Sequence, residues 1–171
     1  HYYGNFDQDN TTATNDANTF IGSSFYGDGP GRMVWDNRYG NMIGDKPHKV
    51  KVISTYTADW EGVFGAYFVF QSGEAWTAWD GTPYGYSSGT SRFAEPAGSR
   101  RGASHWQVDL SYTQNWEFVE GYTARFRADI FNVFDKQTGY SYNPYVVDEN
   151  FGTPRQYYNP RRIQLAVGVK F

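Results

Sequence analysis

The residues of this chain whose types suit acid–base chemistry include three histidines and two aspartates on predicted strands. His1, His48 and His105 are far apart in the sequence, and no catalytic constellation of nucleophile, base and acid stands out around them. Asp109 and Asp129 form a pair of carboxylates, but arginines and lysines alternate with them in neighbouring segments. We therefore expect ion pairs at these positions and predict that the chain is not an enzyme.

An aromatic segment offers the best candidates for contact with a ligand. It reads E-A-W-T-A-W-D-G-T-P-Y-G-Y and carries Trp76, Trp79, Tyr84 and Tyr86. Aromatic rings present flat faces to sugars, peptides or hydrophobic solutes. The alternative is that these rings anchor the chain at a membrane surface, where Trp and Tyr also gather.

A second polar segment near the start of the chain contains oxygen ligands of the kind that calcium prefers. These are Asp7, Asp9, Asn10 and Asp16, but their spacing fits no EF-hand loop. The simpler interpretation is a solvated surface loop. There is no cysteine for a thiolate site or a disulfide, and we expect neither a metal site nor a cofactor.

The composition argues against an ordinary soluble core. Among 171 residues there are 15 Tyr, 13 Phe and 6 Trp but only two Leu, and the mean hydropathy is −0.70. Such a chain suits a thin wall that is wet on one side and bounded by aromatic rings. No apolar run reaches the roughly 18 residues of a transmembrane helix, and the net charge of −3 offers no general attraction for nucleic acid.

The strongest strand signal lies at the end of the chain. Large apolar residues alternate with polar or small ones along R-R-I-Q-L-A-V-G-V-K-F, a period of two that predicts a strand with one apolar face. The apolar members are Ile163, Leu165, Val167, Val169 and Phe171. Weaker alternation predicts four further strands, so that the expected strands span about 48–57, 62–72, 104–115, 122–134 and 160–171.

Between these strands, short turns alternate with long segments. The long segments, at 4–46, 73–103 and 135–158, lack apolar periodicity and are expected to be loops. Transmembrane barrels have short periplasmic turns and long extracellular loops, and strands of this length cross a bilayer when tilted. The apolar faces would then meet lipid and the polar faces a wet lumen. The residues expected to face the lumen are Asp109, Arg125, Arg127, Asp129, Arg162, Gln164 and Lys170.

Several phrases occur in an order typical of one family. They are Gly4-Asn5, Asp45-Lys46-Pro47-His48, Gln71-Ser72-Gly73, Val108-Asp109-Leu110, Arg127-Ala128-Asp129-Ile130-Phe131-Asn132-Val133-Phe134-Asp135 and Asn159-Pro160-Arg161-Arg162-Ile163-Gln164-Leu165. The chain resembles the C-terminal end of a TonB-dependent outer-membrane receptor of the Oar-like branch. The terminal alternation ending on Phe171 resembles the closing strand of outer-membrane barrels, which serves as the signal for the barrel-assembly machinery.

This resemblance implies a fold, a location and a set of partners. The fold is all-β, with residues 1–171 forming the last five or so strands of one transmembrane antiparallel β-barrel of about 22 strands. Five strands leave two edges that lipid cannot satisfy, so we expect the chain to be a fragment, as its start at His1 without a signal peptide also suggests. The implied partners are the rest of the barrel and its plug domain, the TonB complex, the barrel-assembly machinery and the bilayer of a Gram-negative outer membrane.

The function implied by the resemblance is the binding and import of a solute across the outer membrane. A barrel for secretion, adhesion or envelope structure is the alternative within the same fold, because the Oar-like branch does not specify a cargo. A soluble β-sandwich that binds carbohydrate is a third possibility, since a sandwich strand shows the same alternation.

Overall fold

The computed structural model describes residues 3–5, 37, 39–80 and 92–171. These residues form antiparallel β-structure, with no helix in the described part of the chain. The strands are β1 (Tyr3–Asn5), β2 (Tyr39–Asn41), β3 (Lys49–Thr57), β4 (Val63–Gln71), β5 (Ala75–Trp76), β6 (Trp79–Asp80), β7 (Arg92–Phe93), β8 (Arg100–Arg101), β9 (His105–Val119), β10 (Tyr122–Phe131), β11 (Gly139–Tyr142), β12 (Pro154–Tyr157) and β13 (Arg162–Lys170). The expectation of an all-β antiparallel fold is therefore confirmed.

The chain divides into two compact units. The sheet unit comprises His48–Gln71, Ser104–Thr138 and Tyr158–Phe171. The loop unit comprises His1–Pro47, Ser72–Ala103 and Gly139–Tyr157. The division follows the sequence pattern, because the segments with alternating apolar residues form the first unit and the three long connections form the second.

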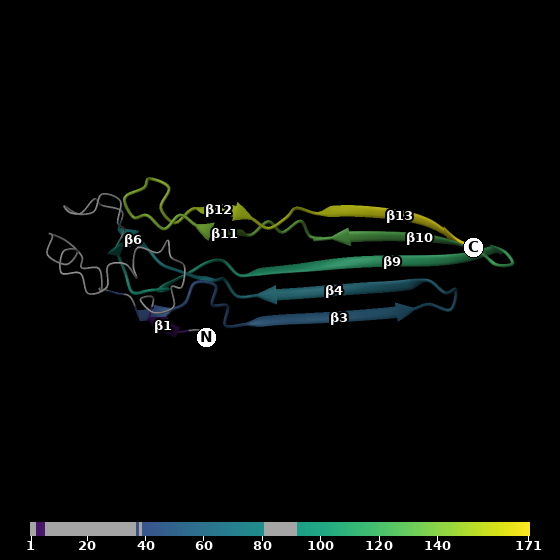
Figure 1. The fold of residues 1–171 in the computed structure, drawn as a ribbon, viewed down its shortest axis with the longest axis horizontal. Helices are drawn as coiled ribbons and strands as arrows, with labels where there is room; N and C mark the ends of the chain where they lie inside the picture. The colour runs from purple at the N-terminus through teal and green to yellow at the C-terminus, as the bar shows by residue number, and fades with distance from the viewer. Residues whose placement is uncertain (1–2, 6–36, 38, 81–91) are drawn as a thin grey trace. The chain divides into compact units, whose positions relative to one another are not determined.

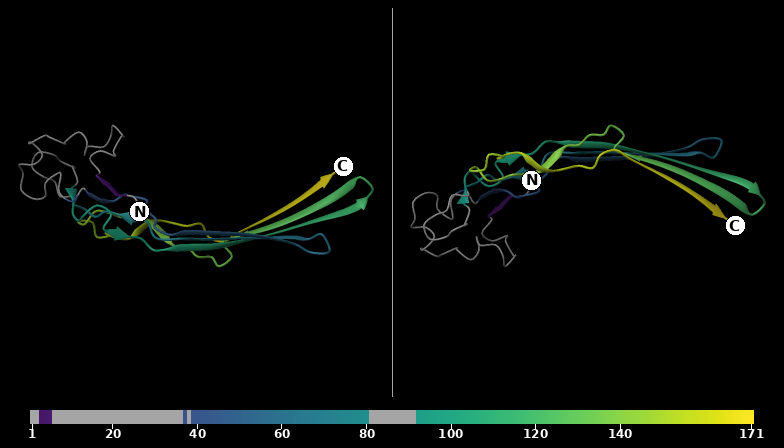
Figure 2. Two further views of the ribbon diagram at one scale, coloured as in Figure 1. Left: turned by 90° about the horizontal axis from the view of Figure 1, so that it is seen from below. Right: turned by 90° about the horizontal axis from the view of Figure 1, so that it is seen from above.

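The sheet unit is one antiparallel sheet of five strands in the order β13-β10-β9-β4-β3 (Figure 1). Each strand pairs with the next long strand along the chain, so the topology is a meander. The five expected strands coincide with β3, β4, β9, β10 and β13, although their ends differ by up to four residues. In Figure 2 the yellow and green strands β13, β10 and β9 diverge from the blue strands β3 and β4 toward one end, as expected of a twisted sheet.

Two tight turns close the sheet at that end. Residues 58–62 connect β3 to β4, where the Ala58 nitrogen donates to the Gly62 carbonyl at 2.8 Å and Glu61 has a φ of 64°. Residues 120–121 connect β9 to β10, and Gly121 has a φ of 85° that glycine adopts without steric cost. The sequence predicted that the strand before this turn ends near residue 115, but β9 continues to Val119.

At the other end of the sheet the connections are long, and they are not structureless as the sequence suggested. Residues 72–104 contain β5 paired with β8 and β6 paired with β7, and residues 132–161 contain β11 paired with β12. The expected first loop, 4–46, includes β2, which pairs with β1. Among the described residues, the buried apolar residues are few, and most of them lie in this loop unit. They are Ala75, Ala78, Phe93 and Ala97, with one further buried alanine, Ala58, in the sheet unit.

Candidate functional site

All seven residues expected to face the lumen lie on one face of the sheet. The strand register pairs Asp129 with Ser111 on one side and with Gln164 on the other, and it pairs Arg127 with Thr113. Side chains of directly paired residues share a face, and the face repeats every second residue. The seven residues are Asp109, Arg125, Arg127, Asp129, Arg162, Gln164 and Lys170. We call this surface the polar face.

The charged groups of the polar face are paired locally. The Arg127 Nε donates to both carboxylate oxygens of Asp129, at 2.8 and 3.1 Å. The Arg125 Nε donates to the Asn115 side-chain oxygen at 2.9 Å on the neighbouring strand. The Arg162 guanidinium lies 4.6 Å from the centre of the Phe131 ring. The expectation of ion pairs between interleaved charges thus holds for Arg127 and Asp129.

The opposite face of the sheet is apolar and largely exposed. On β13 it carries Ile163, Leu165, Val167 and Val169, whose exposed fractions run from 59% to 79%. The register continues this face across the sheet, with Val167 opposite Phe126 and Ile163 opposite Ile130. It ends on β3 and β4 with pairs such as Val52 opposite Phe68 and Val50 opposite Phe70. We call this surface the apolar face.

Aromatic rings gather at both ends of the apolar face. Near the tight turns, the Phe64 ring lies 4.8 Å from Tyr112 and 6.4 Å from Tyr56. Near the long connections, Trp106 makes an edge contact with Phe134 at 5.4 Å, and the Lys136 ammonium lies 4.8 Å from the Trp106 ring. On β4, the small residue Ala66 lies between Phe64 and Phe70, and Phe70 is opposite Trp106.

The aromatic ligand candidates divide between described and undescribed residues. The Trp76 ring stacks on Tyr142 at 5.4 Å and makes an edge contact with Phe151 at 5.9 Å. Trp79 packs against Phe93 at 4.9 Å. Both tryptophans therefore pack within the loop unit. The other two candidates, Tyr84 and Tyr86, lie outside the described residues, as do Asp7, Asp9, Asn10 and Asp16 of the candidate calcium segment.

The described histidines lie on different strands or strand ends of the sheet unit. His48 precedes β3 and is exposed. His105 begins β9 and is buried, with its ring stacked on Tyr158 at 3.7 Å and its Nδ1 3.0 Å from the Thr138 hydroxyl. Residues 85–89, which read G-Y-S-S-G and match the spacing of a nucleophile turn, lie outside the described residues. In the described ranges no three His, Asp or Glu side chains cluster in a way that would hold a metal ion.

Asn132 organises the junction between β10 and the segment that follows, a role that alternation of apolar residues did not predict. Its side chain is 2% exposed and donates to the carbonyls of Asn159 at 2.8 Å and Lys136 at 3.3 Å. Its oxygen accepts from the Lys136 nitrogen at 3.0 Å. Asn132 has a φ of 52°, a conformation that asparagine tolerates better than most residues. A sequence signal for this role was present in the phrase that ends F-N-V-F-D, because an asparagine there interrupts a run of apolar residues.

A second unpredicted cluster lies in the loop unit around Asp45. Its side chain is 1% exposed, and one carboxylate oxygen accepts from the Arg101 Nη2 at 2.8 Å. The Arg101 Nη1 donates to the carbonyls of Asp45 at 2.9 Å and Gly73 at 3.1 Å. One guanidinium thus joins the segment before β3 to the segment after β4. The phrase Asp45-Lys46-Pro47-His48 contained this residue, but nothing in the sequence pointed to Arg101.

Two ionisable groups of the loop unit have shifted pKa values. The hydrogen bond from the Asn150 backbone, followed by one from the Asn143 side chain, lowers the pKa of the exposed Asp148 carboxyl. The side-chain hydrogen bond to Glu95 raises the pKa of Arg100. The Arg100 guanidinium also lies 5.3 Å from the Trp76 ring and 4.8 Å from the Phe151 ring. This arrangement ties β8 to the turn that precedes β12.

Comparison with protein-family models gave no match for this chain, and comparisons with curated proteins and with solved structures gave none either. Within the described ranges, no helix has the length and apolarity needed to cross a membrane.

Proposed function

We propose that this chain forms five consecutive wall strands of an outer-membrane β-barrel, and that the barrel belongs to a TonB-dependent receptor that binds a solute and imports it. The observation that carries the barrel proposal is the contrast between the two faces of the sheet. One face is apolar and exposed, and the other carries ion pairs and amide groups. A wall between lipid and a wet lumen requires this contrast.

Burial explains why lipid is the better environment for the apolar face. Soluble monomers rarely expose a continuous apolar surface beyond a few hundred Å². Here the apolar residues of β13 remain more than half exposed, and in the described residues of the sheet unit Ala58 is the buried apolar residue. Hydrocarbon would cover the apolar face without any second layer of protein.

The strand edges support a larger barrel. In the described residues, β3 and β13 are edge strands, each paired on one side. Each unpaired backbone group costs several kcal/mol in hydrocarbon, so further strands of the same barrel must pair with both edges. The lengths of the strands, 9 residues for β3, β4 and β13 and 10 for β10, match a bilayer crossing. The tight turns would then be periplasmic and the long connections extracellular.

The assignment to TonB-dependent receptors rests on the ordered phrases of the sequence. Import would need parts that these residues do not supply, namely a plug domain and a segment that contacts TonB. The same barrel without those parts would serve secretion, adhesion or envelope structure. Either kind of barrel would have the lumen, the loop segments and the assembly signal, so these features do not distinguish the two functions.

The experiment is to express the full-length protein in a Gram-negative host, with and without TonB. Import predicts that the protein fractionates with the outer membrane and that solute uptake depends on TonB. A plug domain and a TonB-contacting motif upstream of this chain are expected as well. Outer-membrane location without either part would favour the alternative barrel. A monomer that stays soluble without detergent would contradict both and favour the sandwich.

A further inference from the structure

The polar face contains a hollow of about 270 Å³ between β3, β4, β9 and β10. Its floor is Gly65 on β4 beside Ser111 on β9. A Cβ atom added to Gly65 would come within 2.4 Å of the Ser111 hydroxyl oxygen. The hollow therefore exists because this position has no side chain.

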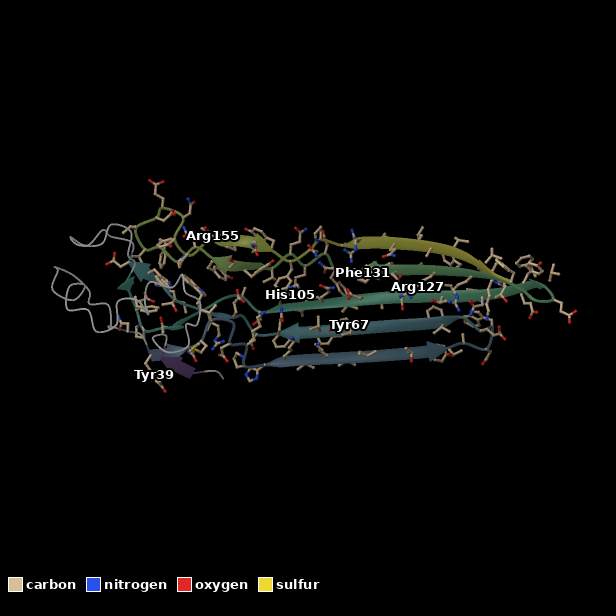
Figure 3. The ribbon with its side chains drawn as sticks, in the orientation of Figure 1. Tyr39, Tyr67, His105, Arg127, Phe131 and Arg155 are labelled. Atoms are coloured by element: carbon tan, nitrogen blue, oxygen red, sulfur yellow. The ribbon has the colours of Figure 1, made fainter. Side chains whose placement is uncertain are left out.

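The walls of the hollow combine polar groups with ring surfaces. Figure 3 labels three of the residues that line it, Tyr67 on β4 and Arg127 and Phe131 on β10, which lie on either side of β9. Asp109 and Asp129 complete its charged lining. A solute in the hollow would meet aromatic carbon and charged hydrogen-bonding groups together.

Several of these groups keep hydrogen-bonding capacity. The Asp109 Oδ1 accepts from the Gln107 side chain at 2.6 Å and from the Asn132 nitrogen at 2.8 Å, whereas its second oxygen accepts no hydrogen bond from the described residues. Arg127 uses Nε for Asp129, and its side chain is 56% exposed. In the described part of the chain, the hydroxyls of Tyr67 and Ser111 also make no hydrogen bond. The hollow thus offers both donors and acceptors.

Three charged residues line the hollow, Asp109, Asp129 and Arg127, and Arg127 is paired with Asp129. The lining therefore carries one more carboxylate than guanidinium, which disfavours an anionic solute. A neutral solute whose hydroxyls both donate and accept would satisfy carboxylate, guanidinium and hydroxyl groups at once.

We propose that this hollow binds a ring of a neutral, polyhydroxylated solute, that is, a sugar. Its apolar ring face would lie against the aromatic surfaces of Tyr67 and Phe131. Its hydroxyls would donate to Asp109 and accept from Arg127, and charge-assisted hydrogen bonds of this kind are the stronger ones. The volume suits one ring, since it is just below the range of about 300–1,000 Å³ typical of sites for larger ligands. As a step in import, this inference rests on the proposed function, because only there does the polar face line a lumen.

The test is isothermal titration calorimetry on the full-length protein in a detergent without a sugar headgroup. The probes are glucose, galactose, mannose and xylose, each titrated separately. We expect at least one to bind with one ring per protein. Asp109→Asn keeps the acceptor for the Asn132 nitrogen but removes the charge, and we expect affinity to fall at least tenfold, about 1.4 kcal/mol. Tyr67→Phe should weaken binding by removing the hydroxyl alone.

Gly65→Ala provides an independent change of shape, since its methyl group would occupy the floor of the hollow and reduce affinity. The matched control is Glu117→Gln, which removes a carboxylate from the same face of β9 at the opposite end of the strand and should leave affinity unchanged. The inference is overturned if none of the four sugars binds the unmodified protein, or if Asp109→Asn, Tyr67→Phe and Gly65→Ala all bind like the control.

The two proposals fail separately. If a sugar binds as described but the protein is absent from the outer membrane, the proposal of a barrel receptor is contradicted and the proposal of a sugar site is supported. If TonB-dependent uptake of another solute is found and no sugar binds, the proposal of a receptor is supported and the proposal of a sugar site is contradicted.

Discussion

The Arg127 Nε donates to both carboxylate oxygens of Asp129, two positions further along the same strand. Asp129 is 6% exposed, so its charge lies within the sheet surface and not in open solvent. Phe126 and Ile130 lie on the opposite face, across from Val167 and Ile163 of β13. One strand thus separates a paired charge from a row of apolar side chains, and a register slip of one residue would exchange the two.

This separation predicts opposite responses to arginine at adjacent positions of β13. Leu165→Arg would place a guanidinium on the apolar face, at a cost of roughly 2–4 kcal/mol at the bilayer midplane. Gln164→Arg would place it on the polar face, opposite Asp129. We expect the first variant to be depleted from the outer membrane and the second to insert normally, as measured by surface abundance. Equal abundance of both variants would contradict the assignment of the faces.

The hydrogen bonds of the buried Asn132 side chain predict a loss of stability when this residue is replaced. Asn132→Ala removes three hydrogen bonds and leaves the Asn159 carbonyl and the Lys136 nitrogen without their partner. Each of these part-buried hydrogen bonds contributes about 0.5–1.5 kcal/mol. We expect a lower thermal unfolding temperature for the full-length protein, followed by circular dichroism.

Asn132→Asp is the matched variant, because it keeps the acceptor for the Lys136 nitrogen and a residue type that tolerates positive φ. It should lose less stability than Asn132→Ala. Gln137→Ala, at an exposed position nearby, should change little. If Gln137→Ala destabilises the protein as much as Asn132→Ala, the hydrogen-bond cluster is not the cause.

The buried carboxylate of Asp45 predicts that Arg101 holds the loop unit together. Arg101→Lys replaces a planar donor group, which reaches three acceptors, with a point charge. We expect a loss of about 1.5–3 kcal/mol, typical of hydrogen bonds to charged groups, and faster proteolysis within residues 72–104. Lys46→Gln is the control, because its 3.9 Å ion pair with Glu74 is partly exposed and contributes about 0–1 kcal/mol. Equal cleavage rates for the two variants would exclude this role for Arg101.

The five strands of the sheet could be predicted from the alternation of apolar and polar residues, because a period-two pattern is local in the sequence. The ends of the strands could not be predicted, because pairing with the neighbouring strand decides where each strand ends. Glu117 lies beyond the expected end of its strand at residue 115, yet it pairs with Thr123, and β9 extends to Val119. Conversely, β10 was expected to reach residue 134 but ends at Phe131, where Asn132 adopts a positive φ.

Most strands of the loop unit could not be predicted from the sequence, because they are short and pair with segments far away in the sequence. β5 exists through the pairing of Ala75 with Arg101 and of Trp76 with Arg100. Two residues carry no periodicity, so no pattern distinguishes them from a loop. The polar face could be predicted residue by residue, whereas the hollow at Gly65 depends on which residues of neighbouring strands lie beside it.

The lowered pKa of Asp148 predicts an acid-sensitive turn. The Asn150 nitrogen donates to the Asp148 carboxylate at 2.8 Å, which favours the charged form. A carboxyl whose pKa is lower in the folded state stabilises the fold above its unfolded pKa, and that contribution is lost as the pH falls through the folded pKa. We expect an NMR titration of Asp148 to have its midpoint below that of an ordinary aspartate. The Asp148→Asn variant should show no acid-induced change at this turn, and a midpoint at or above the ordinary value would contradict the prediction.

The last residue, Phe171, predicts an effect on assembly and not on ligand affinity. Its ring is 92% exposed, next to the edge strand β13. Covering a ring of this size with lipid contributes about 1.5–3 kcal/mol, which is small for a large barrel, so an inserted barrel should survive its loss. In the proposed barrel, the assembly machinery would instead read the terminal alternation before the barrel closes. Deleting Phe171 from the full-length protein should therefore lower its surface abundance, while binding per inserted molecule stays normal, and Phe171→Tyr should retain both. Unchanged abundance with weakened binding would place the terminal strand in the ligand site.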